Sequence, residues 1–207
     1  IVSYILQNTS AQNRMKENSI LKLNQISLTI ENNKRSLIEL NEMLDNDYIT
    51  KAKTFAYIIE KNPNILQSSE ELQNIKNLLS VDELHVINKD GILEYSTIIP
   101  YVGMNFRSTE QTKEFLKLLD NPNIVFAQEI QPNGIEKKLF KYVGVGRKDA
   151  PGFVQVGISP KRQLEAIKQN ELQYIFSNLP VEIESSLFAV DAKTNVIVAH
   201  SEKKYLG

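Results

Sequence analysis

A repeated segment is the feature that most restricts the fold of this chain. Residues 84–103 read LHVINKDGILEYSTIIPYVG and residues 187–207 read LFAVDAKTNVIVAHSEKKYLG, and a single-residue gap aligns them. Each copy holds an apolar run, a polar turn, a second apolar run and a connection that ends on glycine. Asn195 stands where the first copy has Gly91, and asparagine is the residue that most readily replaces glycine at positive φ. The sequence therefore predicts two β-hairpins of the same geometry.

The composition is that of a globular protein with few options for metal or nucleic-acid chemistry. The 207 residues are 42% hydrophobic and 24% charged, which is enough apolar surface for a packed core. Lys and Arg number 24 against 25 Asp and Glu, and this balance gives no reason to expect a nucleic-acid partner. The chain has no cysteine, and His85 and His200 lack metal-ligand spacing, so we expect structural or surface roles for them. No metal or cofactor is expected.

Enzyme motifs and membrane-spanning segments are also missing from the sequence. There is no Gly-x-Ser-x-Gly element and no P-loop, so we expect a binding module, with an enzyme of unrecognised type as an alternative. No run of about 18 apolar residues is present. Residues 1–6, IVSYIL, fit either the trailing end of a membrane anchor or an ordinary helix end.

The front of the chain is predicted to be helical because the main breakers of regular structure come later. The first proline is Pro63 and the first glycine is Gly91. A heptad seam fits packing on the chain's own domain, a homodimer interface, or both over different lengths. Its positions are Leu23, Ile26, Ile30, Asn33, Leu37, Leu40 and Leu44.

The ends of the front helices are predicted from short polar residues. The run from Asp45 to Asp47 is expected to end the first helix, because such side chains compete with helical hydrogen bonds. A second helix is then expected over residues 48–61. Ser68 and Glu71 form a capping box that predicts a third helix.

From residue 82 onward the pattern alternates with a period of two and indicates an antiparallel sheet. Two strands in the first hairpin, a helical excursion over residues 108–119 capped by Ser108, and three further strands are expected. A helix over residues 159–178 and the second hairpin follow. The fold class is therefore α+β with a five-stranded antiparallel sheet, its strands at residues 83–88, 92–97, 124–130, 138–147 and 153–158.

This order of elements is that of the PAS-like sensor fold, and the chain resembles the extracytoplasmic Cache sensor domains of bacterial receptors, of the tandem type. Three segments carry the resemblance: VDELHVINKDGILEYST, KYVGVGRKDAPGFVQVGIS and LFAVDAKTNVIVAHSEKKYLG. It implies a small-molecule sensor outside the membrane, joined to an output domain that is not in this chain. The implied domains are a stalk helix (1–47), a first module (48–158), a linking helix (159–180) and the start of a second, truncated module (181–207).

The resemblance leaves the ligand and the compartment open. An amino acid or a small carboxylate is the ligand such sensors often bind, but their Arg-x-Trp-Tyr pattern is not met, because the residues from Phe106 read Phe-Arg-Ser-Thr and tryptophan is absent. A cytoplasmic PAS-type dimerisation or cofactor-binding module is the main alternative.

Candidate ligand contacts lie where the excursion faces the sheet. Arg107 and Lys141 are the cations expected to neutralise a carboxylate. Polar residues alternating along an antiparallel strand also commonly face water, and this alternative stays open. The candidate ligand-binding residues are Arg107, Gln111, Tyr95, Phe126, Gln128, Lys141 and Tyr142.

Overall fold

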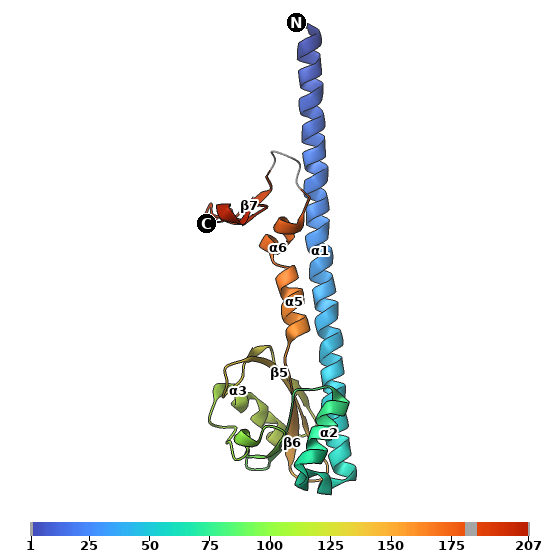
Figure 1. Cartoon of the computed structure of the whole chain (residues 1–207), viewed down its shortest axis with the longest axis vertical. Helices are drawn as coiled ribbons and strands as arrows, with labels where there is room; N and C mark the ends of the chain where they lie inside the picture. Colours follow the sequence, from blue (N-terminus) through green and yellow to red (C-terminus); the bar gives the residue numbers. More distant parts are fainter. Residues whose placement is uncertain (1, 181–185, 207) are drawn as a thin grey trace. The chain divides into compact units, whose positions relative to one another are not determined.

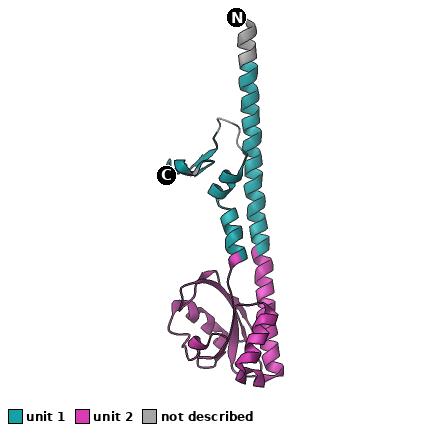
Figure 2. Cartoon of the chain, in the orientation of Figure 1, with its two compact units in different colours: residues 1–40, 162–207 teal, residues 41–161 magenta. Residues whose placement is uncertain are grey.

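The computed structural model describes residues 2–180 and 186–206. The chain divides into two compact units, which Figure 2 colours separately. One unit comprises residues 1–40 and 162–207, and the other comprises residues 41–161. The long helix α1 (Val2–Lys61) contributes residues to both units. The fold is α+β, as predicted.

Helix α1 continues through the Asp45–Asp47 run, so the predicted break at this run is wrong. The side chain of Asp45 forms an ion pair with the buried Lys141 of the sheet, and Asp47 pairs with Lys51 one turn later at 3.0 Å. Tyr48 is buried on the same side of the helix. These contacts hold the polar run in the helical conformation that its intrinsic preference disfavours. The predicted second helix is the last part of α1.

The heptad seam is only partly buried. Ile26 is buried within the first unit and Leu44 within the second, which agrees with packing of the seam on the chain itself. Leu23 is exposed, so that packing does not cover the whole seam.

The second unit contains the predicted antiparallel sheet. Strand order is β2-β1-β6-β5-β3, which in chain order is the PAS-like 2-1-5-4-3, and a short β4 adds to β5. The predicted third strand was too long, because β3 ends at Ala127 and β4 resumes at Gln131. The strands are β1 (Glu83–Asn88), β2 (Leu93–Ser96), β3 (Val125–Ala127), β4 (Gln131–Pro132), β5 (Leu139–Gly146) and β6 (Gly152–Ile158).

The two faces of this sheet have different chemistry. Figure 1 shows α2 (Ser69–Leu79) on one side of the sheet and α3 (Glu110–Lys113) on the other. Valines at matched positions of β1, β5 and β6 form the α2 side, as in the row Val86, Val145 and Val154. The opposite side carries aromatic residues, which pack with the excursion between β2 and β3. Its buried cluster is Ile87, Leu93, Tyr101, Phe106, Phe115, Leu118, Tyr142 and Phe153.

Of the two helix caps predicted in the second unit, one is confirmed and one is wrong. Ser68 caps α2 by accepting a hydrogen bond from the Glu71 amide at 3.2 Å, as predicted. In the excursion the cap is Thr109 and not Ser108, since the Thr109 hydroxyl accepts from the Thr112 amide. The excursion is also not one helix. The segment predicted as one helix is divided into α3, η3 (Glu114–Leu116) and α4 (Lys117–Asp120). Two 3₁₀ helices of this unit lie outside it, η1 (Pro63–Gln67) before α2 and η2 (Ile99–Tyr101) after β2.

In the first unit the helix predicted over residues 159–178 is two helices, α5 (Lys161–Gln169) and α6 (Leu172–Asn178). Glu171 is extended, with φ −64° and ψ 134°, and separates them. Ile175 and Phe176 are buried against Ile26 and Ala199, whereas Ile167 is exposed.

The two repeats form hairpins of the same geometry, as predicted. In the first, His85 pairs with Ser96, Val86 with Tyr95 and Ile87 with Leu93. The second hairpin consists of β7 (Phe188–Val190) and β8 (Ile197–His200), followed by η4 (Lys203–Tyr205). Its pairs match the first one for one: Phe188 with His200, Ala189 with Ala199 and Val190 with Ile197. A bulge follows the second pair in each hairpin.

Candidate functional site

A small cavity lies on the aromatic side of the sheet, beneath the excursion and the segment that joins β4 to β5. Its volume is about 20 Å³, which is room for one water molecule. The sheet, the excursion and the β4–β5 segment each contribute to its wall. The lining residues are His85, Tyr101, Met104, Phe106, Gln111, Thr112, Asn133, Gly134, Ile135, Tyr142 and Gln155.

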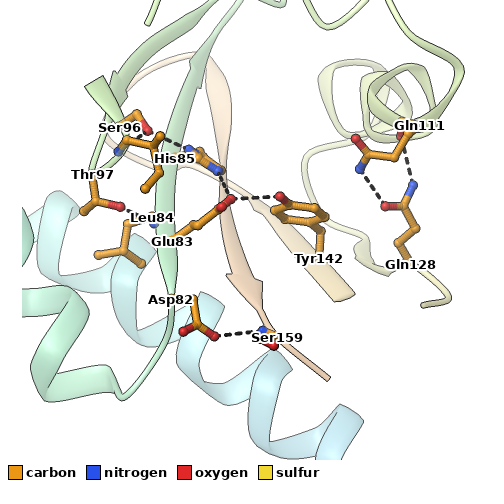
Figure 3. A network of polar contacts seen from close by, with 11 residues as sticks. Asp82, Glu83, Leu84, His85, Ser96, Thr97, Gln111, Gln128, Tyr142 and Ser159 are labelled. Atoms are coloured by element: carbon orange, nitrogen blue, oxygen red, sulfur yellow. Dashed lines mark hydrogen bonds and ion pairs between the residues drawn. The ribbon is translucent and has the colours of Figure 1, made fainter. Parts of the chain in front are cut away.

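A buried polar network runs along one side of this cavity (Figure 3). One carboxylate oxygen of Glu83 accepts a hydrogen bond from the Tyr142 hydroxyl at 2.8 Å and lies 2.9 Å from His85 Nε2. His85 Nδ1 lies 2.9 Å from the Ser96 hydroxyl, which also accepts from the Ile98 amide. Alternation along β1 explains the arrangement, because Glu83 and His85 are two residues apart and face the same side of the sheet. The network places an acidic group beside the cavity.

A glycine makes the contact between Tyr142 and Glu83 possible. Gly157 of β6 pairs with both residues, so it lies between them in the sheet. A Cβ atom at this position would lie 2.5 Å from Cε1 of Tyr142. The missing side chain lets the Tyr142 ring lie across the strand toward the carboxylate.

Three lining residues present buried polar atoms that make no well-formed hydrogen bond in the described part of the chain, although the Tyr101 hydroxyl lies close enough to Glu136 and Asn133 for both to affect its pKa. These atoms are the Tyr101 hydroxyl, both polar atoms of the Asn133 amide, and Nε2 of Gln155. An unpaired buried polar group costs roughly 1–3 kcal/mol. Such groups converging on one cavity indicate a place where water or a polar solute supplies the missing bonds.

The charges around the cavity are predominantly acidic. Burial, followed by the negative charges of Glu83 and Glu136, raises the pKa of Tyr101 to about 12. Burial and the Glu83 carboxylate also raise the pKa of Tyr142. Glu136 is hydrogen-bonded to Lys138 at 2.5 Å, and this ammonium holds the pKa of Glu136 below its usual range. Both tyrosines are therefore neutral hydrogen-bonding groups at physiological pH.

Two of the residues predicted from sequence line the cavity, and a third supports one of them. Gln111 and Tyr142 are in its wall. Gln128 is buried next to Gln111, whose Nε2 donates to Gln128 Oε1 at 2.7 Å, and Gln128 Nε2 donates back to the Gln111 carbonyl at 2.9 Å. Figure 3 shows this pair apart from the Glu83 network. Gln128 thus fixes the orientation of a wall residue.

The other predicted residues lie elsewhere. Arg107 is exposed, and its guanidinium donates to the Asp90 carbonyl. Lys141 is on the α1 side of the sheet, in the ion pair with Asp45. The Tyr95 hydroxyl accepts from Gln67 of η1 at 3.1 Å. Phe126 packs edge-on against Phe115 at 4.9 Å between ring centroids and contributes to the aromatic cluster next to the cavity.

Sequence reasoning missed Tyr101, Asn133 and the Glu83–His85 pair as site residues. Asn133 stands between a proline and a glycine, a pattern that indicates only a turn, and His85 lacks metal-ligand spacing. A signal was present for Gln155, which pairs with His85 in the sheet. Once the strands are aligned, alternation places both side chains on the same face.

A wider groove of about 500 Å³ lies between the end of α1 and the β3–β5 edge, and Lys53, Glu60 and Lys148 are among its lining residues. None of the unpartnered buried atoms of the described residues belongs to this lining. The smaller cavity is therefore the better candidate site.

Within residues 2–180 and 186–206, no helix has the length and apolar character needed to cross a bilayer. The same residues contain no cluster of three or more His, Cys, Asp or Glu side chains arranged to hold a metal ion.

Comparison with known proteins gives matches at the level of structure. The sequence matches no known protein family, and no curated protein is significantly similar to it. The ligand-binding domain of the Campylobacter jejuni chemoreceptor Tlp3, in complex with 4-methylisoleucine, is 15% identical over 89% of this chain and 71% of that chain, with a TM-score of 0.48. The E. coli DcuS sensor domain is 14% identical over 61% of this chain and 96% of that chain, with a TM-score of 0.46. The V. cholerae histidine kinase DctB sensor domain is 16% identical over 84% and 69% of the two chains, with a TM-score of 0.41.

Proposed function

We propose that residues 41–161 form a ligand-sensing module of the PAS-like Cache type, in an extracytoplasmic part of a bacterial signal-transduction receptor. The sheet order and the three sequence segments that resemble Cache sensors support this assignment. The module binds a small solute in the cavity on the aromatic side of the sheet. It has no catalytic task in this proposal.

The observation that carries the proposal is the set of unpartnered polar atoms around one small cavity. Tyr101, Asn133 and Gln155 come from three different segments, yet all three line the same space and each has a buried polar atom without a well-formed hydrogen bond. A folded protein rarely leaves such atoms unpaired, because each one lost its hydration on folding. A solute that bonds to them recovers this cost, and the recovered free energy favours the liganded conformation.

The residues that we propose to contact the solute differ from the set predicted from sequence. Gln111 and Tyr142 are retained, and Tyr101, Asn133 and Gln155 are added. The predicted carboxylate or amino-acid ligand depended on Arg107 and Lys141, and both have other partners in the structure.

A route for the signal starts next to the acidic network. Glu83 adjoins Asp82, whose carboxylate accepts a hydrogen bond from the Ser159 amide at 2.8 Å, just before α5 begins (Figure 3). A displacement of Glu83 on ligand binding would move Asp82, the preceding residue, and so disturb its hydrogen bond with the Ser159 amide. A ligand can shift α5 between two positions only if it binds one of the two conformations more tightly than the other. Such differences in binding free energy are typically about 1–3 kcal/mol.

The proposal extends to the parent protein. It is membrane-anchored, carries its output domain outside this chain, and continues from the β7–β8 hairpin into a second module. A homodimer through α1 is part of the same proposal, since Leu21 and Leu28, one heptad apart, are 61% and 58% exposed. Analytical ultracentrifugation should show a dimer that Leu21→Glu weakens, and a monomer at all concentrations would contradict this part.

Two tyrosines on opposite sides of the sheet provide the test of the site. A thermal-shift screen over amines, amides, amino acids, carboxylates and nucleobases should find at least one stabilising solute. Tyr101→Phe removes a hydroxyl that makes no well-formed hydrogen bond, so it should change the melting temperature of the free protein only slightly and reduce the ligand-induced shift. The matched control is Tyr95→Phe, whose hydroxyl bonds to Gln67 and should not affect the shift.

The screen can also contradict the proposal. If no solute stabilises the protein, or if Tyr95→Phe and Tyr101→Phe change the shift equally, the cavity is not a sensing site. A membrane-spanning helix encoded next to this segment in the parent gene would favour the extracytoplasmic receptor. Its absence there would favour the cytoplasmic PAS-type alternative.

A further inference from the structure

We infer that the cavity recognises a small organic cation, an ammonium group with a neutral hydrogen-bonding group next to it, and that it discriminates against free carboxylates. Amino-acid amides and amino alcohols are the simplest members of this class. The inference depends on the proposed function and specifies the chemistry of the same site.

The charges that face the cavity favour a cation. No lysine or arginine is among its lining residues. Two acidic groups act on the tyrosines of its wall: Glu83, which is hydrogen-bonded to Tyr142, and Glu136, on the segment that joins β4 to β5. Lys138, on the same segment, is paired with Glu136, and the His85 ring is hydrogen-bonded to Glu83 and Ser96. A carboxylate entering this space would meet negative charge without a counter-ion, which is costly in a buried site.

The walls fit an ammonium group as well. Tyr101, Phe106 and Tyr142 surround the cavity, and the His85 ring lies between the two tyrosines, with centroids 6.1 Å from Tyr101 and 6.2 Å from Tyr142. Aromatic faces attract cations through their quadrupole, most strongly where water is excluded. The same aromatic faces do not attract a carboxylate, because their quadrupole presents negative charge to it.

The unpartnered atoms specify the second group of the ligand. The Tyr101 oxygen and Asn133 Oδ1 are acceptors for ammonium hydrogens, of which a primary ammonium has three. Asn133 Nδ2 and Gln155 Nε2 are donors and require an acceptor. A neutral carbonyl or hydroxyl oxygen supplies that acceptor without adding negative charge beside Glu83.

Binding requires the cavity to enlarge, because its volume of about 20 Å³ admits one water. The wall that can yield is the segment joining β4 to β5, which carries Asn133, Gly134 and Ile135 of the lining. Ile135 is 47% exposed and Lys137 has a φ of 58°, so little packing would be lost as this segment opens.

Four small compounds test the inference by separating the ammonium from the carboxylate. L-alaninamide carries an ammonium and an amide, L-alanine an ammonium and a carboxylate, propionamide the amide alone, and propionate the carboxylate alone. Isothermal titration calorimetry on the whole chain should give affinities in the order alaninamide, then propionamide or alanine, with propionate undetectable. We expect alaninamide to bind about tenfold more tightly than alanine, the size of one modest charge interaction.

Two variants test whether the preference for an ammonium group comes from the acidic groups near the cavity. Glu83→Gln should reduce alaninamide binding about tenfold and leave propionamide binding nearly unchanged. Because Glu83 also holds His85 and Tyr142, this variant must first show a native circular-dichroism spectrum. The second variant, Asn133→Asp, adds negative charge on the β4–β5 segment and should tighten alaninamide binding relative to propionamide.

The outcomes separate this inference from the proposed function. Tighter binding of alanine or propionate than of alaninamide would overturn the cationic class while leaving the sensing site intact. No binding by any of the four compounds, with another solute found in the wider screen, overturns the class in the same way. Failure of that whole screen would overturn the proposed function itself.

Discussion

The hairpin of β1 and β2 and the hairpin of β7 and β8 share their hydrogen bonding but differ in their surroundings. In the first, β1 lies between β2 and β6 and is buried along most of its length. The second is a two-stranded sheet in which Phe188 is 54% and Val198 43% exposed. The bulge, the left-handed residue of the turn and the hydroxyl contact at the open end are nevertheless the same, although the second turn is one residue longer. Short-range chemistry therefore determines the hairpin, and long-range packing determines how much stability it contributes.

The largest expected difference between the hairpins is at the equivalent positions Leu93 and Ile197. Leu93 is fully buried in the aromatic cluster, and Leu93→Ala should cost about 2–5 kcal/mol of unfolding free energy through lost burial and a cavity. Ile197 is half-buried, and Ile197→Ala should cost about 1 kcal/mol. Urea denaturation followed by circular dichroism measures both. Equal losses would mean that the second hairpin is as well packed as the first.

The hydroxyl contact at the open end of each hairpin should show a smaller difference. Thr97 Oγ1 accepts from the Leu84 amide at 2.9 Å in a buried position, and Ser201 Oγ accepts from the Leu187 amide at 3.2 Å where it is partly exposed. Thr97→Val leaves the Leu84 amide unpaired and should cost about 1–3 kcal/mol.

The matched variant of the second hairpin, Ser201→Ala, should cost less, because water can reach the amide that it leaves unpaired. The same denaturation experiment compares the two variants. If Ser201→Ala lost more unfolding free energy than Thr97→Val, the contact in the second hairpin would have to be the more buried of the two, contrary to the structure.

Exchange of the turn residues should have a moderate effect. Gly91 has a φ of 76° and Asn195 a φ of 57°, so both are left-handed. Gly91→Ala should cost about 1–2 kcal/mol for this conformation. Gly91→Asn should cost less, and Asn195→Gly should be nearly neutral. Melting temperatures of the three variants test the order, and a Gly91→Asn loss as large as that of Gly91→Ala would show that space, not φ, limits this turn.

The smallest expected effect depends on pH and comes from the first residue of each turn. The Thr194 and Lys193 amides, which donate to Asp191, lower the pKa of its carboxyl group. A carboxyl whose pKa is lowered by folding stabilises the protein above its unfolded pKa, and this contribution disappears as the pH falls through the folded pKa. Asp191→Asn should therefore flatten the stability profile on the acid side of the unfolded Asp pKa of about 3.9.

The equivalent residue of the first hairpin, Asn88, supplies the control. Its amide oxygen accepts from the Asp90 and Ile92 amides and does not titrate. Asn88→Asp should add a similar pH dependence to the first hairpin. An unchanged profile in both variants would mean that the turn carboxylate contributes nothing.

Much of the fold could be predicted because its signals are local. The turns at Gly91 and Asn195, the Ser68 cap and the alternation in the strands each depend on a few neighbouring residues. The break expected at Asp45 failed because the partner that holds this residue in the helix, Lys141, is about a hundred residues away in the sequence. No local pattern reports such a contact.

The site was less predictable because it depends on which side of the sheet each strand residue faces. Lys141 and Tyr142 were both proposed as ligand contacts, although neighbours on a strand point to opposite faces. Arg107 was placed correctly on the excursion, but its side chain turns to the Asp90 carbonyl. Asn133 lines the cavity only because the β4–β5 segment folds back over the sheet, and the sequence of that segment indicates a turn without its direction.

The bulge between Val86 and Ile87 has a consequence for chemistry some distance from it. A strand that slips by one position exchanges every inward side chain for an outward one. Such a slip in the first hairpin would point Glu83 and His85 away from Tyr142. The cavity would then have no acidic group from β1 beside it. The bulge therefore fixes the register of the first hairpin, and the presence of an acidic group beside the cavity depends on that register.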